Sequence, residues 1–118
     1  MPRILLVEDD PEVRLLVEHL LLDAEYEVDS STTLGGGLEL IDSRDFDLVL
    51  ADGRLEDGTG LRLADAARQR SIPALIMTGY AFVLHEPGVD PGDYDILLKP
   101  ISPEELLEAV VRALEAKD

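Results

Sequence analysis

The sequence has no cysteine and no tryptophan, and it has only two phenylalanines and three tyrosines in 118 residues. The absence of cysteine excludes disulfide bonds, thiolate metal sites and cysteine nucleophiles. No apolar run approaches the roughly 20 residues that a membrane-spanning helix needs. Basic residues are also scarce: 10 Lys and Arg stand against 26 Asp and Glu, so the formal net charge is −16.

This charge narrows the classes of partner. Nucleic acid and anionic membrane surfaces are disfavoured, because binding their phosphates requires Lys and Arg. Divalent cations and basic protein surfaces fit an acidic chain better. Many of the acids need only keep a small protein in solution. With 46% apolar residues the chain can form one hydrophobic core, and we predict a single domain over residues 1–118.

Five short apolar runs alternate with stretches of helical period. The runs cover residues 4–7, 26–30, 46–51, 73–78 and 95–99. The candidate helices cover residues 11–24, 33–43, 59–70 and 102–116. Runs that are apolar throughout are typical of parallel strands covered on both faces. The alternation therefore predicts an α/β fold, a doubly wound five-stranded parallel sheet with helices on both faces.

Two segments interrupt this pattern. Three consecutive glycines at 35–37 lie inside the second helix and should weaken it, because glycine is a poor helix former. Residues 81–94 stand where the alternation requires a fourth helix, but they contain two prolines and two glycines. We expect this helix to be short or broken, with at most one helical turn near residues 81–86.

Polar residues follow the predicted strands where each strand ends. They are Glu8, Asp9 and Asp10 after the first strand, Asp52 after the third, Thr78 after the fourth and Lys99 after the fifth. Each has an ordinary explanation: Asp10 before Pro11 can cap a helix, Asp52 can be a turn residue, and most lysines are solvated. In an open α/β sheet, however, ligands gather beyond the carboxyl ends of the strands.

Together these residues suit phosphoryl chemistry. Carboxylates packed together repel one another unless a cation lies among them. Carboxylate oxygens are ligands that Mg²⁺ prefers, and Asp9, Asp10 and Asp52 can supply them. A lysine and a threonine opposite them can hold phosphoryl oxygens while one aspartate attacks the phosphorus atom.

Along nearly its whole length the chain resembles the receiver domain of two-component response regulators. The resemblance rests on Asp9–Asp10, Asp52, Thr78 and Lys99–Pro100, and on the glycine eight residues after Asp52. It implies a flavodoxin-like sheet of strand order 2-1-3-4-5. It also implies a cytoplasmic protein that receives a phosphoryl group from a histidine kinase or a histidine phosphotransfer domain.

The resemblance implies a role for each matching residue. Asp52 would be the phosphoacceptor, Lys99 would pair with the phosphoryl group, and Thr78 would donate a hydrogen bond to it. Asp9 and Asp10 would hold Mg²⁺ together with Asp52 and the backbone carbonyl of Arg54. Two further expectations are a cis peptide bond between Lys99 and Pro100, and a Glu8 side chain that faces away from the site.

Three positions depart from the family pattern. Glu56 stands where the family usually has proline, and Ile96 stands where it often has the aromatic residue of its conformational switch. Tyr94, two residues earlier, is the neighbouring aromatic residue. The third departure is the broken fourth helix. These changes are either neutral, or they indicate a different response to phosphorylation that acts through ordering of residues 80–93.

Two rival functions remain open. One is a Mg²⁺-dependent phosphatase of the haloacid dehalogenase type, although Arg54 stands where those enzymes usually carry a second acid. The other is a receiver-like interaction module that no longer depends on phosphorylation. On the first helix we expect Val13, Leu16, Val17 and Leu20 to face the sheet. Leu15, His19 and Leu22 form a second stripe that is either buried or available to a kinase. The chain is either a stand-alone receiver or one separated from a C-terminal effector.

Overall fold

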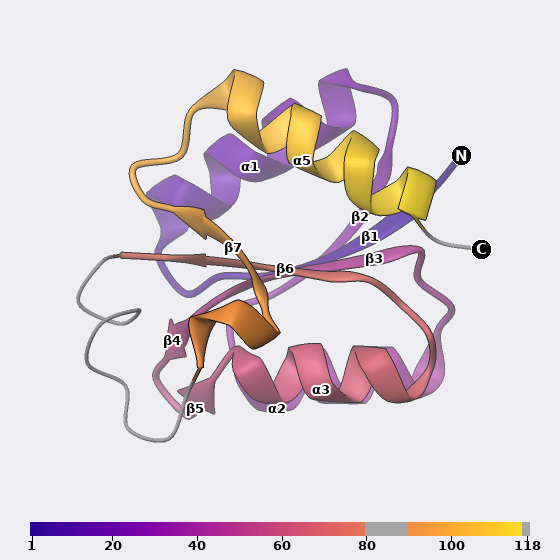
Figure 1. Ribbon diagram of the computed structural model, residues 1–118, viewed down its shortest axis with the longest axis vertical. Helices are drawn as coiled ribbons and strands as arrows, with labels where there is room; N and C mark the ends of the chain where they lie inside the picture. Colours follow the sequence, from indigo (N-terminus) through magenta and orange to yellow (C-terminus); the bar gives the residue numbers. More distant parts are fainter. Residues whose placement is uncertain (80–89, 117–118) are drawn as a thin grey trace.

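The computed structural model describes residues 1–79 and 90–116, which form a parallel sheet with helices on both faces (Figure 1). The sheet consists of β1 (Arg3–Val7), β2 (Glu27–Ser31), β3 (Leu48–Asp52), β6 (Ala74–Thr78) and β7 (Asp95–Leu98). Its order is β2-β1-β3-β6-β7, and every neighbouring pair is parallel. This is the predicted order 2-1-3-4-5, because β4 and β5 lie outside this sheet.

The described helices agree with the predicted ones to within two residues at each end. They are α1 (Pro11–Asp23), α2 (Leu34–Ser43), α3 (Leu61–Gln69) and α5 (Pro103–Ala116). Helices α1 and α5 cover one face of the sheet, and α2 and α3 cover the other (Figure 1). The predicted short or broken helix near residues 81–86 lies outside the described residues. The segment that follows contains a 3₁₀ turn, η1 (Pro91–Asp93).

The core has two layers because the central strands are apolar on both faces. In β1, Ile4 and Leu6 belong to the cluster under α1 and α5, whereas Leu5 and Val7 belong to the cluster under α2 and α3. Helix α1 buries Val17 fully. The prediction that Leu16 also faces the sheet is wrong, because 45% of that residue is exposed.

Two of the three glycines of α2, Gly36 and Gly37, allow close packing. A Cβ atom at Gly36 would lie 2.3 Å from Oγ of Ser31, and one at Gly37 would lie 2.8 Å from Cγ2 of Val7. The helix therefore forms despite a cost of roughly 1 kcal/mol per glycine relative to alanine. The stability of the first turn of α2 depends on contacts with residues outside the helix.

Two short strands between β3 and α3 were not predicted. β4 (Arg54–Leu55) pairs antiparallel with β5 (Gly58–Thr59), and together they form a small hairpin beside the amino-terminal ends of α2 and α3 (Figure 1). Two-residue strands leave no recognisable hydrophobic period. Among the described residues, no helix is both long enough and apolar enough to span a membrane.

Candidate functional site

Four of the predicted site residues, Asp9, Asp52, Thr78 and Lys99, lie at the carboxyl ends of four strands. Asp52 is the last residue of β3, and Thr78 is the last residue of β6. The backbone N–H of Lys99, just after β7, donates to the carbonyl of Thr78 over 2.8 Å. Asp9 follows β1, which lies next to β3 in the sheet. Residues from four separate parts of the chain are thus brought to one edge.

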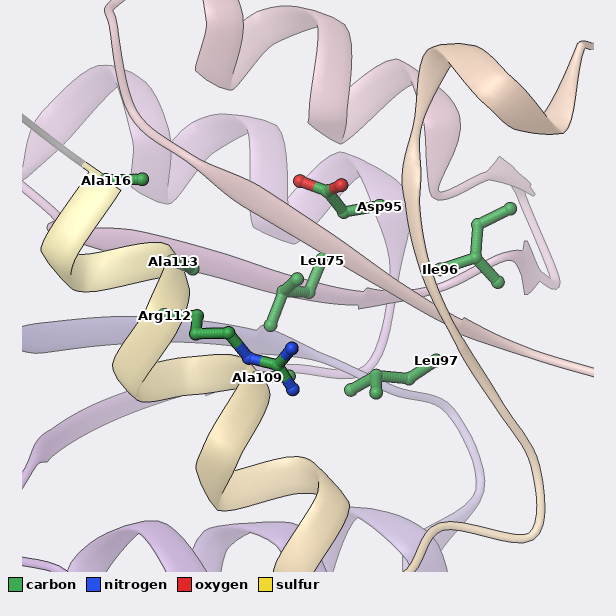
Figure 2. Close-up of a pocket in the computed structure, with 8 residues that line it drawn as sticks. All are labelled: Leu75, Asp95, Ile96, Leu97, Ala109, Arg112, Ala113 and Ala116. Atoms are coloured by element: carbon green, nitrogen blue, oxygen red, sulfur yellow. The ribbon is translucent and has the colours of Figure 1, made fainter.

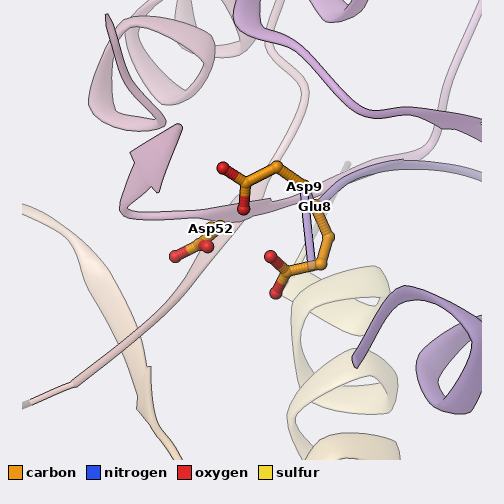
Figure 3. Close-up of side chains that lie close together, drawn as sticks. All are labelled: Glu8, Asp9 and Asp52. Atoms are coloured by element: carbon orange, nitrogen blue, oxygen red, sulfur yellow. The ribbon is translucent and has the colours of Figure 1, made fainter. Parts of the chain in front are cut away.

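Three carboxylates form a cluster at this edge. One oxygen from each of Glu8, Asp9 and Asp52 lies within 4.8 Å of the other two (Figure 3). Glu8 and Asp52 are buried, whereas Asp9 is partly exposed. Like charges this close together repel, so the arrangement favours a bound cation.

Lys99 supplies a positive charge to the cluster. Its Nζ lies 2.9 Å from Oε1 of Glu8 and 3.3 Å from Oδ2 of Asp52. Burial alone would lower the pKa of Lys99, but the hydrogen bond with Glu8 and the charges of Asp52 and Glu8 outweigh it and raise that pKa. The ammonium group therefore stays charged, and it is in contact with the predicted phosphoacceptor.

Glu8 is the member of the cluster that the sequence reasoning missed. Its side chain is fully buried, and its Oε2 accepts the backbone N–H of Asp10 over 3.2 Å. Burial, together with the neighbouring Asp52 carboxylate, raises the pKa of Glu8 to about 7, although the hydrogen bond with Lys99 lowers it. The expectation that Glu8 faces away from the site is wrong.

Asp10 takes the alternative role that the sequence left open. It is exposed, and its Oδ1 accepts the N–H groups of Glu12 and Val13 at the start of α1. The carboxylate of Asp10 therefore caps α1 and lies outside the carboxylate cluster. Of the three acids after β1, Glu8 and Asp9 belong to the carboxylate cluster.

The loop after Asp52 is tied closely to the site. The N–H of Arg54 donates to Oδ1 of Asp52 over 3.3 Å, and the N–H of Gly60 donates to the carbonyl of Gly53 over 3.1 Å. A Cβ atom at Gly60 would lie 2.0 Å from the carbonyl oxygen of Asp52. This approach explains why glycine stands eight residues after Asp52. Glu56, at the family's proline position, is exposed at the tip of the hairpin.

Tyr94 is positioned far from Thr78. It lies just before β7, at the end of the strand opposite to Lys99, and its hydroxyl donates to Oδ1 of Asp65 over 3.2 Å. The guanidinium of Arg68 lies 4.7 Å from the centre of its ring. Tyr94 is therefore bound to α3 through both of these residues.

A separate pocket of about 330 Å³ lies between α5 and the strands β6 and β7 (Figure 2). Its lining includes Leu75 and Asp95, which are paired near the amino ends of these strands. The carboxylate cluster is at the carboxyl ends. The lining of the pocket includes none of Glu8, Asp9, Asp52, Thr78 and Lys99.

The cluster fits Mg²⁺ on the chemistry of its donors. The groups within 4.8 Å of one another are all carboxylates, from Asp52 at the end of β3 and from the two residues that follow β1. Mg²⁺ prefers oxygen ligands and is usually bound by one or two carboxylates together with water. The three carboxylates can carry three negative charges, whereas the ammonium group of Lys99 supplies one positive charge.

The chain matches a family model described as the response regulator receiver domain over residues 4–111. It is 32% identical over 117 residues to the response regulator protein PilR of Pseudomonas aeruginosa, which is 97% of this chain and 26% of PilR. It is 34% identical over 116 residues to the response regulator ArlR of Staphylococcus saprophyticus, which is 97% of this chain and 52% of ArlR. The chain thus spans about a quarter to a half of the length of these curated relatives.

Solved structures agree with these matches. A CheY-like response regulator receiver domain protein from Methanospirillum hungatei JF-1 is 31% identical, has a TM-score of 0.82, and the match covers 99% of this chain and 96% of that one. The response regulator protein TrrA from Thermotoga maritima, solved in complex with Mg²⁺ and BeF, is 26% identical with a TM-score of 0.83. That match covers 96% of this chain and 99% of TrrA.

Proposed function

The chain belongs to the response regulator receiver domain family of two-component signalling, and from this premise we propose that Asp52 accepts a phosphoryl group in a Mg²⁺-dependent reaction. One observation carries the proposal: Asp52 lies in a cluster with two other carboxylates and in contact with Lys99. A solitary turn aspartate would have neither neighbour. We take residues 1–118 as one receiver unit.

The chemistry follows from the positions of the side chains. A carboxylate oxygen of Asp52 would attack the phosphorus of a phosphohistidine in line, and the bond from phosphorus to the imidazole nitrogen would break. The imidazole leaves with its electron pair, and an acyl phosphate forms on Asp52. Lys99, already 3.3 Å from Asp52, would pair with the phosphoryl oxygens, and the hydroxyl of Thr78 would donate to another.

Bound Mg²⁺ would neutralise the carboxylates and the phosphoryl oxygens during this transfer. Asp9, Asp52 and the backbone carbonyl of Arg54 stay in the proposed ligand set, and Glu8 takes the place of Asp10. Glu8 would contribute directly or through water. Its contacts with Lys99 and with the N–H of Asp10 keep its carboxylate turned toward the cluster.

The acyl phosphate would serve as a signal and be lost by slow hydrolysis, so the domain is a switch and not a turnover enzyme. The phosphoryl oxygens would favour one of two conformers by their new contacts with Lys99 and Thr78. A histidine kinase or a histidine phosphotransfer domain is the proposed donor. We propose this partner and a cytoplasmic location on the basis of family membership.

Helix α1 offers a surface for such a donor. Leu15 and Leu22 are exposed, so the alternative that their stripe is buried is wrong, and Leu16 is exposed beside them. Because α1 begins directly after the carboxylate cluster, a helical partner that packs on its first turns would bring a phosphohistidine close to Asp52.

Mass spectrometry after incubation with acetyl phosphate and Mg²⁺ tests the proposal. The parent should gain one phosphoryl group, and Asp52→Asn should gain none. Labelling that persists in Asp52→Asn would contradict the assignment of the acceptor. No labelling of either protein would favour an interaction module, and multiple turnover of a generic phosphate ester would favour a phosphatase.

A further inference from the structure

The hairpin that follows Asp52 is attached to the start of α2 by one side chain. Asp57 lies at the hairpin tip, and its Oδ1 accepts the N–H of Leu34 over 2.8 Å. Its Oδ2 accepts the N–H of Gly35 over 3.0 Å. These are the first two residues of α2, whose N–H groups have no partner inside the helix. The hydrogen bonds from Gly35 and then Leu34 lower the pKa of Asp57, so the carboxylate is ionised at neutral pH.

The first turn of α2 needs this support. It contains the three glycines, and the side chain of its local cap, Thr33, accepts the N–H of Gly36 over 3.0 Å. Thr33 and Asp57 thus accept the N–H groups that have no partner inside the helix. Asp57, which lies in a distant part of the chain, accepts two of them. The side chain of Leu34 adds a second contact, because a Cβ atom at Gly58 would lie 2.5 Å from its Cδ2.

The other end of the hairpin reaches the carboxylate cluster. Asp57 is five residues from Asp52, and the N–H of Arg54 in β4 donates to Oδ1 of Asp52. The hairpin closes where Gly60 lies against the backbone of Asp52 and Gly53. A displacement of the hairpin would therefore move the backbone around Arg54.

We propose that Asp57 is a positioning residue for the phosphorylation site, which couples the capping of α2 to the placement of the loop after Asp52. The inference rests on the proposed function, in which the carbonyl of Arg54 contributes to the Mg²⁺ site. Coupling between two sites is reciprocal. If capping by Asp57 strengthens the binding of Mg²⁺, then Mg²⁺ must stabilise the hydrogen bonds from Leu34 and Gly35 to Asp57.

A titration with Mg²⁺ alone tests whether capping by Asp57 strengthens the binding of Mg²⁺. The amide chemical shifts of Gly53 and Arg54, measured by NMR, report the binding. Asp57→Ala should raise the dissociation constant for Mg²⁺ by about fivefold, a typical lower value for coupling between sites. Asp57→Asn, which keeps one acceptor oxygen, should lie between Asp57→Ala and the parent. Glu56→Ala is the matched control, because it removes one negative charge from the same hairpin tip, and it should change the constant by less than about twofold.

Equal losses in Asp57→Ala and Glu56→Ala would overturn the proposal, because charge alone would then explain them. A loss of thermal stability in Asp57→Ala with an unchanged Mg²⁺ constant would also overturn it, since Asp57 would then only stabilise the fold. A parent that does not bind Mg²⁺ would overturn both this inference and the metal requirement of the proposed function. Binding that is equal in the parent and in Asp57→Ala would overturn this inference alone.

Hydrogen exchange in the unaltered protein tests the reciprocal half and needs no variant. Saturating Mg²⁺ should slow the exchange of the Leu34 and Gly35 amides by about the same factor of five. The amide of Gly36, bonded to Thr33, is the internal reference and should slow less. Unchanged exchange at Leu34 and Gly35, with Mg²⁺ bound, would overturn the coupling.

Discussion

Nζ of Lys99 lies 2.9 Å from Oε1 of Glu8, a carboxylate buried at the end of β1. The same nitrogen lies 3.3 Å from Oδ2 of Asp52, so one positive charge faces two carboxylates, with Asp9 as a third nearby. Three carboxylates close together repel one another, and binding of a metal ion would relieve that repulsion. The stability of the domain should therefore depend on pH, on Lys99 and on divalent cations.

Glu8 should make the metal-free protein less stable as the pH rises. Its pKa is raised in the folded state from 4.5 to about 7, so folding favours the protonated form. The stabilisation is fully present below pH 4.5 and is lost as the pH rises through 7. At 1.36 kcal/mol per pKa unit, the loss is on the order of 3 kcal/mol at most.

Urea denaturation of the parent and of Glu8→Gln, each between pH 5 and pH 8 without metal, measures this loss. The stability of the parent relative to Glu8→Gln should fall across this range. Adding Mg²⁺ should stabilise the parent most at the upper end, because the ion favours the ionised cluster. A difference between the two proteins that stays constant with pH would contradict the assignment.

Replacing Lys99 should lower the stability of the protein, because the carboxylates of the cluster would then repel one another without the ammonium group. Lys99→Met leaves Glu8 and Asp52 without their ammonium partner, and removing one member of a buried ion pair is strongly destabilising. Because Lys99 is partly exposed, we expect a loss of about 2 kcal/mol at pH 8 and a smaller one at pH 5, where Glu8 is protonated.

Thermal or urea denaturation at the two pH values checks this expectation. Lys99→Arg keeps the charge and should retain more of the stability than Lys99→Met, even though the shape of its side chain differs. If Lys99→Met were as stable as the parent at pH 8, the ion pairs would contribute nothing to folding.

Most of the fold could be predicted because it depends on hydrophobic period. The strands and the regular helices had predicted bounds within two residues of those observed. The strand order came from the resemblance to receiver domains and not from the hydrophobic period. The β4–β5 hairpin could not be predicted, because two-residue strands show no period. Its attachment to α2 joins Asp57 to residues more than 20 positions earlier in the chain, and no local pattern indicates such a contact.

The site was predicted less accurately, because three acids follow one another after β1. Strand alternation does not decide which of them turn inward once the strand has ended. The sequence nevertheless contained a useful signal in Asp10–Pro11. A carboxylate that accepts the N–H groups at the start of α1 cannot also face the cluster, so the capping motif points to Glu8 and Asp9 as the inward pair.

Gly60 should not tolerate a side chain. Gly60→Ala would place a Cβ atom 2.0 Å from the carbonyl oxygen of Asp52, and the obstacle is backbone that cannot rotate away. We expect a loss of at least about 2 kcal/mol, which is in the range for strained backbone and overpacking, and slower phosphorylation of Asp52.

Gly79→Ala is the control for Gly60→Ala, since a Cβ atom at Gly79 would have no described neighbour within 4 Å. It should change the stability by no more than about 1 kcal/mol. Urea denaturation and labelling by acetyl phosphate check both variants. A Gly60→Ala protein as stable and as readily labelled as Gly79→Ala would mean that the loop can shift without affecting Asp52.

Leu15 should contribute to docking of the phosphodonor and not to the chemistry. It is 60% exposed on α1, and a charge at this position would oppose an apolar contact with a helical partner. Leu15→Asp should slow transfer from a phosphorylated histidine kinase on the order of tenfold, as loss of an interface anchor commonly does. Phosphorylation by acetyl phosphate should be unchanged, because this small donor needs no docking surface.

Leu22→Asp is the control for Leu15→Asp. Leu22 is 57% exposed and lies seven residues later on the same side of α1, about 10 Å farther from the cluster along the helix. It should slow transfer less than Leu15→Asp, since the phosphohistidine must reach Asp52 near the amino end of the helix. If Leu15→Asp slowed phosphorylation by the kinase and by acetyl phosphate equally, the substitution would be shown to disturb the site itself. If Leu15→Asp and Leu22→Asp slowed transfer from the kinase equally, and neither slowed labelling by acetyl phosphate, the whole of α1 and not only its first turns would form the contact.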